Sequence, residues 1–319
     1  MTAHASDEDR WLTSAADAAF QQAASKVIER ARQAGTPVAI WQDGHVEEIP
    51  SDKLLPNVWA NALAIEHRGW LRKFDNQYLK YWENLLGNDQ EAALTESRVR
   101  RLLQHHGAIV EPNESLTGDG RRPDFRCTVG DNHFYVEATC VQIATAEKKT
   151  GVKNLATGIL PYNKMGMIEA IHAKCKEKAS PFADLDRPAL LAIGTFHAHA
   201  AMDFSERFFA NLVLTGKAAM AWDIDTSGQP VGETSDFTGL EAAAFLRPDT
   251  TQGVGFARSS ISGLLLCGFG FEPPRLLGVL HPNPVRPFDP ALLPGIQFAR
   301  LELDRASDQL TIQWPEGGD

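Results

Sequence analysis

Apolar and polar residues alternate strictly over two neighbouring stretches near the middle of the chain, and a Gly-Asp pair separates them. The stretches run from Asp124 to Val129 and from Asn132 to Thr139. Alternation with a period of two is typical of strands that bury one face, and a type II′ turn favours Gly at its first central position. The sequence therefore predicts a β-hairpin that turns at Gly130-Asp131.

The turn also predicts the register of this hairpin, because Val129 then faces Asn132 and Asp124 faces Glu137. One face becomes apolar and holds Phe125, Cys127, Val129, Phe134, Val136 and Ala138. The opposite face is mostly polar and holds Asp124, Arg126, Thr128, His133, Tyr135, Glu137 and Thr139. Carboxylates opposed across two strands lie roughly 5 Å apart at Cβ. Like charges so close repel each other unless a cation or a proton joins them, so the pair is a candidate cation site.

Helical and strand-like periods alternate over the remainder of the chain. Between residues 94 and 281 we expect helices at 95–106, 163–178 and 204–214, and strands at 108–111, 188–194, 263–271 and 275–281. Thr95 is the expected cap of the first helix, and residues 143–162 are expected to form a long polar connection. The order helix, strand, hairpin, helix, strand indicates an α/β domain around a mixed sheet.

The N-terminal part of the chain has a different pattern, which predicts three regions. Residues 1–52 are expected to form a small helix-plus-hairpin unit, with the hairpin at 36–49. Residues 53–93 are expected to be a long helical connector packed on the core, and residues 94–319 the α/β domain. Trp70, Phe74, Tyr78 and Trp82 recur every four residues in the connector. Such a stripe can stack nucleobases, but at helical spacing it favours packing.

Composition narrows the class of protein. The net charge is -10, no apolar run reaches the ~20 residues of a membrane span, and the N-terminus lacks the pattern of a signal peptide. The four cysteines show no C-x-x-C spacing. These features predict a cytoplasmic protein with reduced thiols and without a membrane partner. Residues 96–180 hold 13 Lys and Arg against 10 Asp and Glu, so the hairpin region is the least acidic part of the chain.

Other candidate motifs are weaker. His197-Ala198-His199 is a possible metal-binding pair, but no third ligand stands nearby in the sequence. Cys140 follows Thr139, and the register places it on the apolar face, where a packed thiol is expected. The nearest glycine-rich segment, residues 252–256, has neither the P-loop pattern nor the dinucleotide fingerprint.

The order of elements, with acidic residues on adjacent strands, resembles the PD-(D/E)XK nuclease superfamily. Pro123-Asp124 stands where the family has PD, and Glu137-Ala138-Thr139 stands where it has (D/E)-x-K. The resemblance covers roughly residues 94–285. It implies a restriction-endonuclease-like fold, which is a mixed β-sheet flanked by helices.

The resemblance also implies a chemistry, the metal-dependent hydrolysis of phosphodiesters in DNA or RNA. Asp124, Glu137 and the main-chain carbonyl of Ala138 would bind Mg²⁺ or Mn²⁺, which activates a water. Glu96 would support them from the preceding helix, although an exposed first turn would equally favour an acid there. The expected phosphate contacts are Arg121, Arg122, Lys148, Lys149 and Lys153. Many cutters of duplexes act in pairs, so a homodimer is an option.

The sequence departs from the family pattern at Thr139, because a threonine hydroxyl cannot supply the positive charge of the family's lysine. Some relatives take this lysine from the next helix, where Lys178 fits best, followed by Lys174; Lys164 is also available. If no lysine compensates, the chain would be a catalytically inactive module that binds nucleic acid or assembles proteins. A third interpretation makes Asp124 and Glu137 ordinary surface residues of an unrelated α/β protein.

Overall fold

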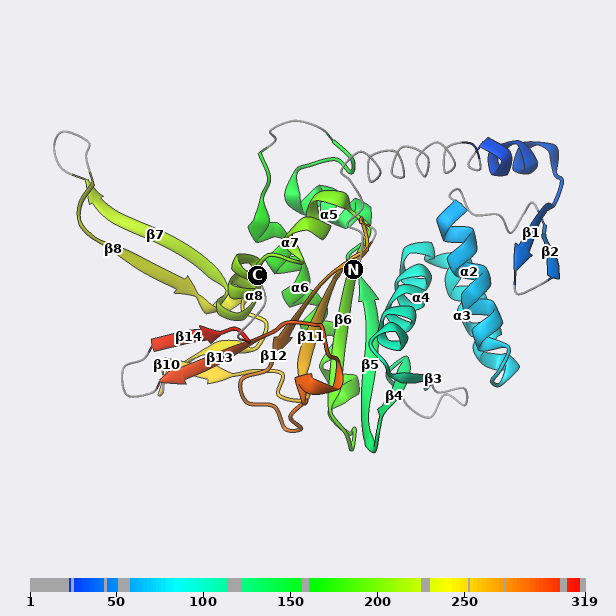
Figure 1. Ribbon diagram of the computed structural model, residues 1–319. Coiled ribbons are helices and arrows are strands. Elements are labelled where there is room, and N and C mark those ends of the chain that lie inside the picture. Colours follow the sequence, from blue (N-terminus) through cyan, green and yellow to red (C-terminus); the bar gives the residue numbers. More distant parts are fainter. Residues whose placement is uncertain are drawn as a thin grey trace, which may run out of the picture. The chain divides into compact units, whose positions relative to one another are not determined.

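The chain forms two compact units, Met1–Lys73 and Phe74–Asp319, and each is described here by itself (Figure 1). The computed structural model describes residues 23, 26–42, 45–50, 58–113, 122–156, 161–224, 230–251, 253–271, 273–304 and 309–315. Arg121 and the expected turn at Asp43-Gly44 lie outside these residues.

The first unit contains a helix over residues 26–34, the hairpin of β1 (Val38–Gln42) and β2 (His45–Ile49), and α2 (Val58–Leu71). The expected helix and hairpin are present. A small cluster of apolar side chains joins all these elements: Ile28, Ala31, Val38, Ile49 and Ile65. Because a hairpin and one helix bury little by themselves, α2 supplies the missing apolar surface.

The long helical connector expected over residues 53–93 is not a single helix, because α2 ends at Leu71 and α3 (Asn76–Asn88) begins after Asp75. The Asp75 side chain accepts a hydrogen bond from the Gln77 amide at 2.8 Å, which is the geometry of an N-cap. Trp70 and Trp82 are both buried, as the packing interpretation expects. Trp82 Nε1 also donates to the Ala93 carbonyl at 3.2 Å and so ties α3 to the following helix.

That following helix, α4 (Gln90–His105), starts earlier than expected. Asp89 caps it by accepting from the Ala92 amide at 3.0 Å, whereas Thr95 is a buried residue inside the helix. The predicted capping role of Thr95 is therefore wrong. Val99 and Leu103 of this helix are fully buried and belong to its apolar face.

The second unit is built on a mixed sheet of eight strands in the order β14-β13-β12-β11-β6-β5-β4-β3. The strands are β3 (Ile109–Pro112), β4 (Phe125–Val129), β5 (Asn132–Cys140), β6 (Ala189–Thr195), β11 (Gly263–Gly268), β12 (Arg275–Leu280), β13 (Phe298–Asp304) and β14 (Gln309–Gln313). The pairs β5–β6, β6–β11 and β12–β13 are parallel, and the other pairs are antiparallel. The predicted mixed α/β class is confirmed.

Helices cover both faces of this sheet (Figure 1). The main apolar core joins Leu191 and Ile193 of β6 to α6 (Lys164–Lys178) and α8 (Arg207–Thr215). The alternate residue Gly194 points to the other face, where a Cβ would lie 2.8 Å from Cγ2 of Thr95 in α4. Gly194 therefore lets α4 approach the sheet closely.

The expected polar connection at 143–162 is only partly right, because it contains α5 (Ile143–Thr150). The Ile143 amide at its start donates to Glu91 Oε2 at 2.8 Å. Helix α5 also crosses α6 very closely, since a Cβ on Gly166 would come within 2.1 Å of the Lys149 carbonyl oxygen. Glycine is therefore the residue that this crossing requires.

Several elements were not expected from the sequence. The helix expected at 204–214 is present as α8, and the short helix α7 (Ala198–Asp203) before it was not expected. Two further hairpins pair β7 (Lys217–Ile224) with β8 (Pro230–Gly239), and β9 (Leu246–Asp249) with β10 (Gly253–Phe256). Short 3-10 turns lie at Ser180–Phe182, Leu240–Ala242 and Pro290–Leu292. Over the described residues, none of the helices is long and apolar enough to cross a membrane.

Candidate functional site

The central hairpin has the predicted register. Val129 pairs with Asn132 and Phe125 with Val136, so Asp124 stands opposite Glu137 at the next position. Gly130 has φ +56°, as the first central residue of a type II′ turn requires. The apolar face is buried at Phe125, Cys127, Phe134, Val136 and Ala138.

Asp124 lies where the ladder between β4 and β5 ends. Strand β4 begins at Phe125, while β5 continues to Cys140 and leaves its last backbone groups beyond the partner strand. Asp124 Oδ2 accepts a hydrogen bond from the Ala138 amide at 2.6 Å. The carboxylate thus takes the place that a backbone carbonyl would occupy in a longer β4.

The backbone of Ala138 faces the Asp124 side of β5. The neighbouring odd-numbered residues point the other way, since the amides of Tyr135 and Val141 donate at 2.9 Å to the carbonyls of Pro188 and Gly194. Within a strand residue the N–H and C=O point to the same side. The Ala138 carbonyl is therefore directed to the side on which the Asp124 carboxylate lies.

Glu137 forms a buried ion pair with Lys178, the last residue of α6. Lys178 Nζ lies 2.5 Å from Glu137 Oε1, and the side chains are 11% and 3% exposed. Lys174, one turn earlier, pairs with Glu177 at 3.5 Å on the surface. Lys164 lies at the opposite end of α6. Of the three candidate lysines, the structure brings Lys178 to the acidic pair.

A cleft of about 400 Å³ lies between the end of β5 and helices α5 and α6, and Asp124, Glu137 and Lys178 are not among its lining residues. Thr139 lines it, and Thr139 shares a face of β5 with Glu137, two residues before it. The charged groups along the cleft are Asp89, Lys149, Glu169, Lys174 and Glu177. Cys140 also contributes to the wall, but burial raises the pKa of its thiol to about 12, so it is protonated and packed as expected.

The expected phosphate-binding residues have different surroundings. Lys149 lines the cleft and pairs with Glu169 at 3.0 Å. Lys153 pairs with Glu147 at 2.8 Å, and this hydrogen bond is the main reason that the pKa of the Glu147 carboxyl is lowered. Lys148 and Arg122 are exposed.

Glu96 is partly buried in the middle of α4, between the fully buried Thr95 and Ser97. It is not in the first helical turn, so the exposed-turn explanation for this acid is wrong. Helix α4 covers the sheet face of Gly194, whereas Glu137 and Lys178 lie on the face covered by α6. Its supporting role remains a prediction.

The side chains of His197 and His199 form hydrogen bonds with backbone groups. His197 Nδ1 accepts from the Ala200 amide at 3.2 Å, and its Nε2 lies 3.0 Å from the Val152 carbonyl. This combination requires the neutral ring with the proton on Nε2. His199 Nε2 lies 2.9 Å from the Ala156 carbonyl. Within the described part of the chain, groups of three or more His, Cys, Asp or Glu that could hold a metal are absent.

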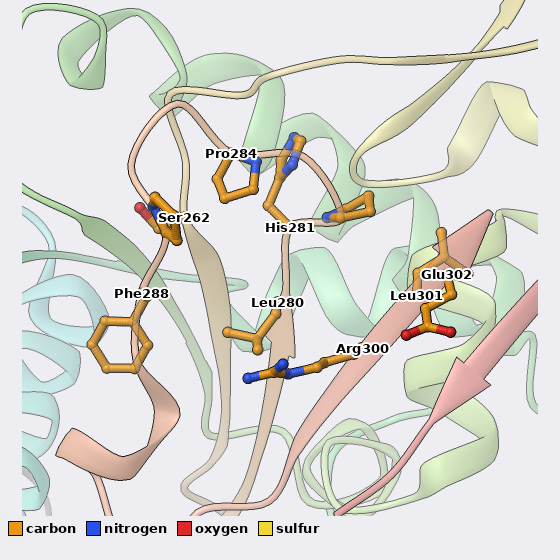
Figure 2. A pocket seen from close by; sticks show the side chains of 10 residues that line it. Ser262, Leu280, His281, Pro284, Phe288, Arg300, Leu301 and Glu302 are labelled. Atoms are coloured by element: carbon orange, nitrogen blue, oxygen red, sulfur yellow. The ribbon is translucent and has the colours of Figure 1, made fainter.

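A second cleft, of about 260 Å³, lies between the Pro-rich loop after β12 and strand β13 (Figure 2). The Ser262 hydroxyl and the His281 ring in this cleft form hydrogen bonds with backbone carbonyls. Ser262 Oγ donates to the Arg286 carbonyl at 2.6 Å. His281 donates to the Ala257 carbonyl at 2.8 Å, and burial lowers the pKa of its ring to about 4.

A partly buried polar network at the start of α6 was not predicted from the sequence. Tyr162 and Lys164 there meet Asp203 and Glu206, which lie about forty positions further along the chain. Only the fold brings the two segments together, so no local pattern announces the network.

No protein-family model, curated protein or solved structure matches the chain.

Proposed function

We propose that the chain is a divalent-metal-dependent nuclease of the PD-(D/E)XK type, which hydrolyses phosphodiester bonds in nucleic acid. One observation carries the proposal. Lys178 of α6 pairs with Glu137, and Asp124 accepts from the amide of the next residue, Ala138, although Thr139 stands at the position of the family's lysine. Two carboxylates and one lysine are the charge set that this chemistry needs.

The order of elements supports this assignment. Helix α4 is followed by the antiparallel strands β3, β4 and β5, then by helices α5 and α6, and then by β6 parallel to β5. This is the helix, strand, hairpin, helix, strand arrangement on which the resemblance to restriction-endonuclease-like proteins was based.

The donor atoms fit a hard divalent cation. Asp124, Glu137 and the Ala138 carbonyl offer only oxygen, which suits Mg²⁺ or Mn²⁺. A carboxylate has two oxygens, so one can bond Lys178 or the Ala138 amide while the other serves as a ligand. When bound, the ion would polarise the scissile phosphate and acidify a water.

The protein's own groups have distinct roles in this proposal. Lys178, held in place by Glu137, supplies a fixed positive charge where negative charge develops on the phosphate. Its burial strengthens that effect, because charges interact more strongly away from water. Substrate would approach along the cleft lined by Thr139, with Lys149 and Lys174 at its walls to contact phosphates.

The test is cleavage of single- and double-stranded DNA and RNA in Mg²⁺, Mn²⁺ or EDTA. Wild type, Asp124→Asn and Glu137→Gln are compared with Asp131→Asn, which changes an exposed carboxylate at the turn of the same hairpin. We expect metal-dependent cutting that both site variants lose by roughly a thousandfold or more, at the upper end of what one charge-stabilising group contributes. The control should cut like wild type.

Two outcomes would reject the proposal. Equal cutting by wild type and both site variants would show that the activity has another source. No cutting by wild type, with binding retained, would identify a catalytically inactive module, and the replacement of the motif lysine by Thr139 would be the reason.

A further inference from the structure

The cleft shown in Figure 2 lies where a parallel ladder of the main sheet opens. Strands β12 and β13 pair at two positions, and their ladder ends where Val279 faces Ala299. Pro282, two positions after the end of β12, has no N–H, so it cannot donate to a continued ladder. The two segments therefore part and leave a cleft of about 260 Å³ between them, which we call the β13 cleft.

Backbone groups of both strands are directed into the β13 cleft. The Gly278 amide donates to the Gln297 carbonyl at 2.7 Å, so alternate residues of β12, including Leu280, direct their N–H and C=O toward β13. In a parallel pair one residue bonds the two residues that flank its partner, so Ala299 and then Leu301 face β12 in return. Beyond the end of the ladder, the Leu280 carbonyl and the Leu301 N–H thus offer one acceptor and one donor.

Two opposite charges stand on the wall that β13 forms. Arg300 and Glu302 lie two positions apart on this strand and so share a face, and both are exposed and line the cleft. In Figure 2 the Arg300 guanidinium extends under Leu280 toward the side of Phe288, whereas the Glu302 carboxylate lies on the opposite side. In the part of the chain that the structure describes, neither charge takes part in a hydrogen bond or an ion pair.

The opposite wall, residues 282–288, is rigid. Its Arg286 carbonyl accepts from Ser262 Oγ at 2.6 Å, and the Phe288 ring packs against Phe298 with the ring centroids 5.7 Å apart. Proline restricts the backbone, and three residues of this wall that line the cleft are prolines: Pro282, Pro284 and Pro287. The wall is therefore preformed and largely apolar, which is typical of sites for small molecules.

We infer that the β13 cleft binds a free α-amino acid with an apolar side chain. The carboxylate of the amino acid lies against Arg300 and the Leu301 N–H, and its ammonium group lies against Glu302. Its side chain packs along the prolines of residues 282–288. The inference goes beyond the proposed function, because β6 and β11 separate β12 from β5 in the sheet.

The two charges select a zwitterion. Residues two apart on a strand lie about 7 Å apart at Cα, and an amino acid carries both charged groups on one carbon, so one molecule reaches both side chains. A phosphate would be attracted by Arg300 but repelled by Glu302. Sites for drug-sized ligands have volumes of roughly 300–1,000 Å³. The volume of about 260 Å³ therefore suits a smaller molecule.

The test is isothermal titration calorimetry of the wild-type protein with L-leucine, L-valine and L-phenylalanine. We expect binding of at least one of them. Two analogues of the tightest binder separate the charges: its amide lacks the carboxylate, and its deaminated acid lacks the ammonium group. Each analogue should bind roughly tenfold or more weakly, because it loses a hydrogen-bonded charge.

Variants of the wall test the same contacts from the side of the protein. Arg300→Met and Glu302→Gln should each weaken binding roughly tenfold or more. Arg247→Met and Glu241→Gln remove one exposed charge of each sign outside the cleft, so these controls should bind like wild type. Circular dichroism checks that all four variants are folded.

Three results would overturn the inference: no binding of any of the three amino acids, unchanged affinity in Arg300→Met or in Glu302→Gln, or analogues that bind as tightly as the amino acid. The proposed function fails separately, because calorimetry with amino acids involves no nucleic acid. If cleavage is absent while the wall variants weaken binding, only the nuclease is rejected. If cleavage occurs while no amino acid binds, only the β13 cleft is rejected as a site.

Discussion

The two ends of α6 each place a lysine against a carboxylate, but the surroundings differ. Lys178 at the C-terminal end lies 2.5 Å from Glu137. Lys164 at the N-terminal end lies 3.1 Å from Asp203 and 2.6 Å from Glu206. The two pairs differ in their burial and in the charges around them.

The N-terminal end is a satisfied structural network. The Tyr162 hydroxyl donates to Asp203 Oδ2 at 2.5 Å, and Lys164 binds the other oxygen. Burial raises the pKa of Asp203 although both hydrogen bonds lower it. Burial alone would lower the pKa of Lys164, but its bonds to Glu206 and Asp203 raise it overall. The network joins α6 to the corner between α7 and α8.

The C-terminal end differs in two respects. Glu137 stands opposite a second carboxylate, Asp124, and next to Thr139, which opens onto a cleft. Two carboxylates so close repel each other unless a cation lies by them, and Lys178 supplies one positive charge beside the two. A lysine–carboxylate pair thus becomes a candidate for catalysis when a like charge and an access route adjoin it.

The largest expected difference between the two ends is in cleavage rate. Lys178→Met keeps the apolar stem and removes the charge, and we expect the rate to fall by about 10²–10³, the usual cost of one charge-stabilising group. Lys164→Met makes the same change at the other end of the helix and should leave the rate within twofold of wild type. Single-turnover cleavage by protein shown to be folded by circular dichroism measures both. Equal losses in the two variants would make Lys178 a structural residue.

The next effect is on stability. Lys178→Met leaves a buried charge on Glu137, which costs about 3–5 kcal/mol of unfolding free energy. Adding Glu137→Gln should recover most of this loss, because no charge is then left behind. Lys164→Met should cost only about 1–2 kcal/mol, since Asp203 keeps its bond to Tyr162. Urea denaturation measures all three, and a double variant no more stable than Lys178→Met would contradict the account.

The smallest expected effect is a pH dependence of the unfolding free energy. It arises from Asp203, which pairs with Lys164 at the N-terminal end of α6. The pKa of Asp203 is raised in the folded protein, so the folded state binds this proton more tightly than the unfolded state. The stabilisation that this proton gives the folded state is fully present below the pKa of Asp203 in the unfolded state, which is near 4. It is lost as the pH rises through the pKa of Asp203 in the folded state. Wild type should therefore lose stability relative to Asp203→Asn between pH 4 and pH 7 in parallel urea titrations. A constant difference would show that the pKa of Asp203 is not raised.

The central hairpin could be predicted from the sequence because two local signals agree there. Gly130 selects the turn, and the alternation on both sides selects the same register. Cap residues were harder to read. Asp75 caps α3, but the aromatic residues recur every four positions across the break between α2 and α3 and so hide it. Asp89 caps α4, but Thr95, which lies inside that helix, is also a residue type that favours caps.

Only the part of the candidate site that lies within one hairpin could be predicted from the sequence. Asp124 and Glu137 belong to one hairpin, so turn chemistry relates them. Which of the lysines on α6 reaches them depends on how that helix lies on the sheet, and a helical period cannot tell Lys178 from Lys174.

The crossing of α5 and α6 has a consequence for the cleft. At Gly166 the backbones of the two helices touch with no room for a methyl group, and Lys149, a wall residue of the cleft, is the residue touched. The spacing of the α5 and α6 backbones, which carry many of the cleft residues, is therefore fixed by this crossing. A methyl group at position 166 would push α5 and α6 apart and so displace the cleft residues of these helices together.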